Sequence, residues 1–296
     1  MALTREQFDQ ACAAEHRQLQ LAHLQRLSYP QLQELLAADP ARAACWIRSA
    51  AECGLAAAQL RLGRMLLEGT GIARDAPAAL QWFERAAAQG DAAALNMVGR
   101  CLENGWGIGV DPVRAVALYQ ASARRGHDWG EYNLANMLFD GRGVPCDRAR
   151  ALHWYRRAAR RGHGRAMNLL GRCLEEGWGC IADPAAAALW YQRSAATGYF
   201  RGQYNYAAVL AQHGHAAAAA VWYLRAATTG DQPIRRAIVR ALGNATAAAL
   251  CDARERIAVL VRGGYCRPPE ARIVSPEIQP ESSDARNTTI LATSCG

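Results

Sequence analysis

Apolar and small residues recur along this chain in stripes that fit α-helices. In the first unit they stand 4, 8, 11 and 12 positions after Gly54, at Ala58, Leu62, Met65 and Leu66. This spacing places all four side chains on one face of a helix. A second stripe follows at i, i+3, i+4 and i+7, with two neighbouring aromatic residues among alanines, and we expect both aromatics on the buried face. Each unit therefore predicts two helices joined by a turn.

The paired stripes repeat with a fixed period. The unit ends in an aromatic pair, small residues and a glycine, and five of these glycines are spaced 36 residues apart, at Gly54, Gly90, Gly126, Gly162 and Gly198. A period in this range is typical of a solenoid, in which no unit can bury its apolar face alone. The sequence therefore predicts an all-α solenoid.

Glycine and aspartate mark the expected helix ends inside each unit. The first glycine of a Gly-x-Gly turn stands where the residue after a helix adopts positive φ, and an aspartate six positions later is a good N-cap. These pairs are Gly69 and Asp75, Gly105 and Asp111, Gly141 and Asp147, and Gly177 and Asp183. A glycine or alanine nine positions after each unit glycine predicts a close approach between helices.

The period divides the chain into five parts. The repeats are framed by a half unit and by closing helices, and the last part is rich in Pro, Ser, Thr and Glu, a composition typical of disorder. The parts are N-terminal helices at 1–38, a half repeat at 39–53, five repeats at 54–230 (54–89, 90–125, 126–161, 162–197 and 198–229), capping helices at 231–264 and a disordered tail at 265–296.

The unit AAAQLRLGRMLLEGTGIARDAPAALQWFERAAAQG resembles the Sel-one-like repeat family, a helix–turn–helix relative of the tetratricopeptide repeat. The resemblance covers 39–230 and implies a right-handed superhelix that acts as a non-catalytic adaptor or scaffold. It implies a protein or peptide partner, frequently in bacterial signalling, regulatory or envelope processes, and no cofactor. A secreted branch of the family carries C-x7-C disulfides. Cys45 and Cys53 have that spacing but lie elsewhere in the unit, which disfavours the secreted reading.

Composition narrows the partner classes. The formal charge is +8, and all 34 basic residues are arginine. They are spread along the chain, and the densest run, 148–165, alternates with apolar helix positions, so we expect a solvated face and no nucleic-acid partner. No run of 18 apolar residues and no signal peptide is present, which predicts a cytoplasmic protein without a membrane span. The sequence identifies neither the partner nor the oligomeric state.

Enzyme and metal signals are sparse. The chain has no GxSxG, phosphate-binding loop or HExxH motif, and its ten cysteines form no CxxC pair. Cys101 and Cys173 replace methionines of sister repeats and are expected to be small core residues. We therefore expect no enzyme, no metal and no cofactor. The alternative is a metal- or thiol-dependent enzyme-associated module that uses His213 and His215, or a reactive cysteine.

Two sets of residues are candidates for partner binding. The first lies 6, 10 and 13 positions after the unit glycines, opposite the core stripe, where the first helices would line a concave groove. Arginine and asparagine there can bind a peptide backbone or carboxylate, whereas the apolar members can instead be buried against flanking helices. This set is Leu60, Arg64, Leu67, Asn96, Arg100, Tyr132, Asn136, Phe139, Asn168, Arg172 and Tyr204, with Glu103 and Glu175 on the same face. The second set, Trp106 and Trp178, stands at the turn edge, either as interface anchors or as covers for the next repeat.

Overall fold

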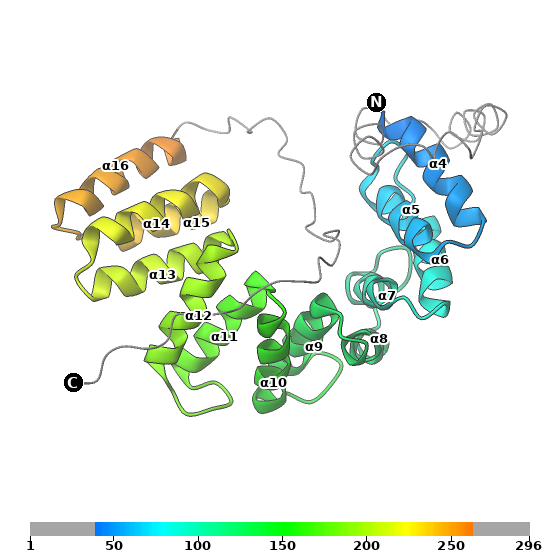
Figure 1. Ribbon diagram of the computed structural model, residues 1–296, viewed down its shortest axis with the longest axis horizontal. Coiled ribbons are helices and arrows are strands. Elements are labelled where there is room, and N and C mark those ends of the chain that lie inside the picture. The colour runs from blue at the N-terminus through cyan, green and yellow to red at the C-terminus, as the bar shows by residue number, and fades with distance from the viewer. Residues whose placement is uncertain (1–38, 263–296) are drawn as a thin grey trace, which may run out of the picture.

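The computed structural model describes residues 39–262, which contain thirteen α-helices and no strand. The N-terminal helices predicted for 1–38 and the tail predicted for 265–296 lie outside these residues. The helices form consecutive antiparallel pairs that stack into an open arc, from α4 at one end to α16 at the other (Figure 1). They are α4 Pro40–Glu52, α5 Ala56–Glu68, α6 Ala76–Ala88, α7 Ala92–Asn104, α8 Pro112–Arg124, α9 Asp128–Asp140, α10 Arg148–Arg160, α11 Gly164–Glu176, α12 Pro184–Ala196, α13 Phe200–Gln212, α14 Ala216–Thr229, α15 Gln232–Ala241 and α16 Ala248–Arg262.

The predicted helix ends are confirmed. The four turn glycines that follow α5, α7, α9 and α11 have φ of 76°, 72°, 70° and 69°, the left-handed region in which glycine lacks the Cβ penalty. The aspartates six residues later cap α6, α8, α10 and α12, and each accepts a bond of 2.9–3.0 Å from the backbone N–H three residues on. Local residue chemistry therefore sets the repeat boundaries.

The close approach predicted nine positions after each unit glycine is a contact between an aromatic ring and a glycine. A Cβ built on Gly99 would lie 2.8 Å from the ring of Tyr119, and one on Gly171 would lie 2.7 Å from the ring of Tyr191. Both tyrosines are fully buried, at 0% and 1% exposure. The absence of a methyl group at these glycines thus lets the second helix of a repeat place its largest side chain against the first.

Only one of the two neighbouring aromatics is buried, which corrects the expectation that both are. Tyr155 is 2% exposed, but Trp154 is half-buried and carries the Arg157 guanidinium 4.7 Å from its ring. The same arrangement recurs in Trp82 with Arg85 at 4.5 Å, Trp190 with Arg193 at 4.7 Å and Trp222 with Arg225 at 4.7 Å. In each case the arginine three residues on, one helical turn away, lies over the outward face of the indole.

The buried side chains form two clusters. The larger runs from Ala44 to Tyr191, and the smaller from Ala207 to Ile257. The boundary falls between α12 and α13, at the start of the fifth unit, whose own turn between α13 and α14 lacks the Gly-x-Gly of the other repeats. In the smaller cluster α16 packs against both α14 and α15 and closes the stack.

Candidate partner-binding surface

The first helices of the repeats line the inside of the arc. Figure 1 shows α5, α7 and α9 on its inner side, and α7 contacts α9 just as α11 contacts α13. Helices on the inner side of a curved stack lie closer together than those on the outer side, which agrees with these contacts. We call the surface carried by α5, α7, α9, α11 and α13 the inner face.

Three asparagines of the candidate groove are engaged inside the solenoid. Asn96 and Asn168 are each 4% exposed. Each accepts a bond of 2.8 Å from an asparagine of the next first helix, Asn133 and Asn205 respectively. Asn136 accepts a bond of 2.7 Å from the Tyr155 hydroxyl. The amides of Asn96 and Asn168 therefore link neighbouring repeats, and that of Asn136 links the two helices of one repeat, so each has a hydrogen-bond partner as buried polar groups commonly do.

The arginines of the groove and the tryptophans of the turn edge are in contact. The Arg100 guanidinium lies 5.0 Å from the ring of Trp106, and that of Arg172 lies 5.1 Å from the ring of Trp178. A guanidinium over an indole is a favourable cation–π arrangement. The two candidate sets thus form one surface in these repeats instead of two separate ones. Arg64, at the same position in the first repeat, is half-buried.

A cluster of aromatic rings lies between the third and fourth repeats. Tyr132 stacks on His163 with ring centroids 4.8 Å apart, and Trp129 meets the same imidazole edge-on at 4.5 Å. Phe139 and Trp178 lie 5.3 Å apart, with the Arg148 guanidinium 5.3 Å from Phe139. We call these five rings the inner aromatic cluster: Trp129, Tyr132, Phe139, His163 and Trp178. All except His163 are half-buried, and Tyr132, Phe139 and Trp178 pack against the larger core cluster.

The remaining apolar members of the groove are also half-buried. Leu60 and Leu67 pack against the larger core cluster. Tyr204 packs against the smaller one, with its ring 5.8 Å from that of Tyr223. Each of these side chains is therefore shared between the core and the inner face.

His163 is a buried helix cap with an unsatisfied ring nitrogen. Its Nδ1 accepts a bond of 3.1 Å from the Ala166 N–H, so its proton sits on Nε2, which has no hydrogen-bond partner. The side chain is 6% exposed, and burial lowers its pKa to about 4. The imidazole is therefore neutral at physiological pH.

The sequence reasoning missed a buried carboxylate at the start of α9. Glu131 is 0% exposed, and its Oε1 lies 3.0 Å from Arg157 Nη2 and 3.5 Å from Arg161 Nε. Burial raises its pKa despite the two arginines, because desolvation penalises the charged form most. The sequence carries a signal for this residue. The equivalent positions of the other repeats hold Gln59, Leu95, Met167 and Gln203, so Glu131 is the exception in having a carboxylate.

A second carboxylate joins neighbouring repeats at the turn edge. Glu103 accepts a bond of 2.5 Å from the Tyr119 hydroxyl, and its other oxygen lies 2.6 Å from Arg142 Nη1 of the next repeat. Arg142 also lies 3.4 Å from Asp140. In the fourth repeat the Tyr191 hydroxyl donates to Glu175 at 2.6 Å.

The alternative function, a metal- or thiol-dependent module, would use His213 and His215 or a reactive cysteine. His213 and His215 are exposed, and His213 Nδ1 lies 2.8 Å from the Val209 carbonyl oxygen. Among residues 39–262, no group of three or more His, Cys, Asp and Glu side chains is arranged to hold a metal ion. Cys101 and Cys173 are buried as predicted, and burial raises the pKa of both thiols to about 11. Reactive thiolate is therefore disfavoured at these two positions.

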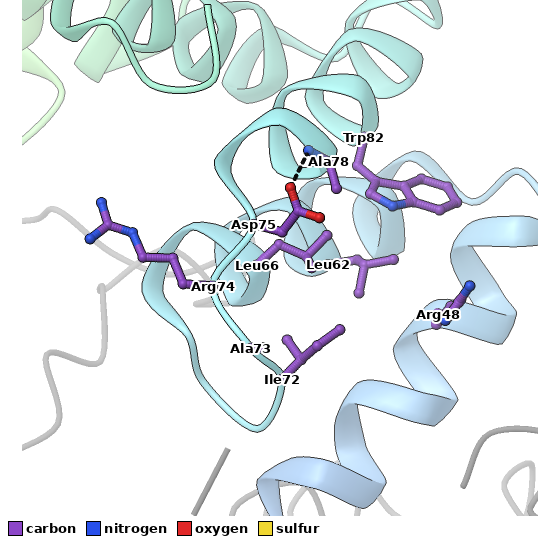
Figure 2. Close-up of a pocket in the computed structure, with 9 residues that line it drawn as sticks. All are labelled: Arg48, Leu62, Leu66, Ile72, Ala73, Arg74, Asp75, Ala78 and Trp82. Atoms are coloured by element: carbon purple, nitrogen blue, oxygen red, sulfur yellow. Dashed lines mark hydrogen bonds between the residues drawn. The ribbon is translucent and has the colours of Figure 1, made fainter. Parts of the chain in front are cut away.

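A small apolar pocket opens between α4, α5 and α6 (Figure 2). Leu62, Leu66, Ile72 and Trp82 line it, while the Arg74 side chain points away. Its volume of about 160 Å³ is below the roughly 300–1,000 Å³ of typical small-molecule sites. None of the helices in the described part of the chain is long and apolar enough to cross a bilayer.

Comparison with known families finds four repeats in this chain. The model of the Sel1 repeat matches four times, at residues 56–91, 92–127, 130–163 and 164–199. The matches begin with α5 and stop at the residue before α13. No curated protein matches the chain.

Solved structures of related proteins share the fold. A Sel1 repeat protein from Oxalobacter formigenes is 29% identical, with 70% of this chain and 84% of that chain covered and a TM-score of 0.62. A protective antigen of uropathogenic Escherichia coli with an SLR fold is 27% identical, with a TM-score of 0.60. That alignment covers 75% of this chain and 49% of the antigen, so this chain spans about half its length. An immunity protein from Pseudomonas aeruginosa, 18% identical over 70% of this chain and 80% of its own with a TM-score of 0.51, shares the fold alone.

Proposed function

We propose that this protein is a non-catalytic adaptor. Its four Sel1 repeats make it a Sel1 repeat protein, and this helical repeat family usually mediates protein–protein interaction. Its inner face holds a segment of a protein partner. The chain offers this face as a continuous strip on five first helices, with the inner aromatic cluster near its middle.

The pairing of an arginine with a half-buried tryptophan carries the proposal. Arg100 on Trp106 and Arg172 on Trp178 recur on the inner face at nearly the same distance, 5.0 and 5.1 Å. Arginine and tryptophan are the residues most enriched among the energetic centres of interfaces. A guanidinium held over an indole is pre-organised, so little side-chain entropy is lost when it binds a carboxylate or a backbone carbonyl.

The experiment compares two double variants of the same chemistry on opposite faces. Arg100→Ala with Arg172→Ala removes the inner pairs, and Arg85→Ala with Arg193→Ala removes two arginines that stack on outer tryptophans at 4.5 and 4.7 Å. Partners cross-linked in cells of the source organism are quantified by mass spectrometry for each variant. Since a hydrogen bond to a charged group contributes about 1.5–3 kcal/mol, the inner variant should capture its partner at least tenfold less well.

Circular dichroism and thermal melting show whether each variant remains folded. The outer variant should capture the partner as the wild type does. Full capture by the inner variant together with loss in the outer variant would assign binding to the outer face and contradict the proposal.

A further inference from the structure

Two stretches of the chain are close copies of each other at a spacing of two repeats. Residues 96–106 read NMVGRCLENGW and residues 168–178 read NLLGRCLEEGW, with eight of eleven residues identical. The spacing is 72 residues, twice the basic period, and the repeat between them differs at most of these positions. The chain therefore carries a superrepeat whose two copies can be compared atom by atom.

The two copies make the same contacts. The Tyr119 hydroxyl donates to Glu103 at 2.5 Å, and that of Tyr191 donates to Glu175 at 2.6 Å. The asparagine links are 2.8 Å in both copies, and the arginine–tryptophan distances are 5.0 and 5.1 Å. Each glutamate is thus held in the same orientation by a buried tyrosine.

One contact of the first copy is missing from the second. Glu103 binds the Arg142 guanidinium at 2.6 Å, and this pairing leaves its side chain 19% exposed. At the position 72 residues after Arg142 stands Gly214, which has no side chain. Among residues 39–262, no arginine or histidine forms an ion pair with Glu175, and this glutamate is exposed.

The first copy shows that a guanidinium fits at this place. Burial and the hydrogen bond to Glu103 raise the pKa of Tyr119, whereas the positive charges of Arg100 and, from the next repeat, of Arg142 oppose this shift. Both cations therefore share the site around Glu103. In the second copy burial likewise raises the pKa of Tyr191, and Arg172 alone opposes the shift, so one guanidinium stands there where the first copy has two.

We propose that Glu175, oriented by Tyr191, is a docking point for an arginine side chain of a partner protein, which takes the place that Arg142 fills in the first copy. The inference rests on the proposed function and specifies the chemistry of the partner. Arginine is favoured over lysine because the planar guanidinium can bind a carboxylate through two parallel N–H groups.

The test uses two arrays of random nonapeptides, one with a fixed central arginine and one with citrulline, the neutral isostere of arginine. Labelled full-length protein should bind the arginine array about tenfold more strongly. Glu175→Gln should abolish this preference. Glu176→Gln, which changes the net charge equally one residue further on, should keep it. Arg142→Gln should open a second site at Glu103 and raise binding to the arginine array about twofold.

The proposal fails if Glu175→Gln retains the arginine preference, or if an array with central lysine binds as strongly as the arginine array. It also fails if the wild type shows no arginine preference whereas the chain lacking residues 263–296 shows one. The site would then hold this chain's own C-terminal segment. In each of these cases the comparison of inner-face and outer-face variants still tests the adaptor function separately.

Discussion

The smallest side chain in each repeat determines how closely its two helices pack. Gly99 and Gly171 face buried tyrosine rings at distances that leave no room for a methyl group. Glycine inside a helix costs about 1 kcal/mol relative to alanine. The burial of a whole ring of Tyr119 or Tyr191 offsets that cost, since a buried aromatic side chain contributes several times as much.

Gly99→Ala should therefore destabilise the protein although alanine is the better helix former. We expect a net loss of up to about 2 kcal/mol, as overpacking typically costs about 1–3 kcal/mol and the propensity gain is about 1 kcal/mol. Urea titration followed by circular dichroism measures this change. Gly109→Ala is the control, because a Cβ there meets no atom within 4 Å. A Gly99→Ala protein as stable as the wild type would show that the Tyr119 ring can shift.

His163 should make the stability of the protein depend on pH. Burial lowers its pKa from 6.5 to about 4, so between these values the unfolded chain binds a proton that the folded chain does not. The neutral His163 therefore stabilises the folded protein at neutral pH. This contribution to the free energy of unfolding, up to roughly 3 kcal/mol, is lost as pH falls from about 7 to 4. Glu131 acts in the opposite direction, because its raised pKa favours protonation in the folded state.

The comparison with His163→Asn isolates the histidine, since asparagine keeps an N-cap acceptor for Ala166. The difference in unfolding free energy between wild type and variant should rise with pH from 4 to about 6.5 and be constant above 7. A difference that does not change with pH would mean that His163 has the same pKa in the folded and unfolded states.

At the scale of the helix, the second helices α6, α10, α12 and α14 each carry one aromatic for the core and one for the surface, whereas α8 carries Leu118 and Tyr119. In α10 Tyr155 is buried and donates to Asn136, whereas Trp154 is half-buried beneath Arg157. A hydrophobic stripe read at i, i+3, i+4 and i+7 includes both positions and does not separate them. The equivalent Leu118 of α8 is also half-buried although Ala121 follows three residues later, so the position on the helix, and not the arginine, leaves this side chain outside the fully buried core.

Tyr155→Ala should consequently destabilise the protein more than Trp154→Ala, even though tryptophan is the larger residue. For the tyrosine we expect about 3–5 kcal/mol, as for other large-to-small core changes, and for the tryptophan about half of that. Guanidinium titrations of the two variants give both values. Equal losses would indicate that the indole is as well packed as the phenol ring.

Much of the helix architecture follows from the sequence because it is local. Asp75 caps α6 and Gly69 ends α5 through contacts within a few residues, so their roles can be predicted from spacing. The contacts of the inner face are different in kind. Asn133 binds Asn96 across 37 residues and Arg142 binds Glu103 across 39, and neither pairing follows from the pattern inside one unit. The groove predicted from helix geometry thus contained residues that link the repeats, and the arginine–tryptophan contacts joined two candidate sets that seemed separate.

At the scale of the whole molecule, a solenoid is held together by contacts between neighbours, and a weak interface can divide it. The boundary between the two buried clusters lies between α12 and α13. Partly buried residues of α13, such as Tyr206 and Val209, still pack against the larger cluster. Six of the eleven residues of the smaller cluster are alanines, which bury little apolar surface each.

We expect the C-terminal unit, α13 to α16, to unfold before the rest of the stack. Trp222 is the only tryptophan between residues 200 and 262, so the fluorescence difference between wild type and Trp222→Phe reports on this unit. In a urea titration this difference should change at a lower denaturant concentration than the far-UV circular dichroism of the whole protein. The physical reason is the smaller buried area of the C-terminal cluster, since the denaturant midpoint depends on the stability of each cooperative unit. If the two transitions coincide, the contacts of Tyr206 and Val209 couple the clusters tightly enough for the solenoid to unfold as a single unit.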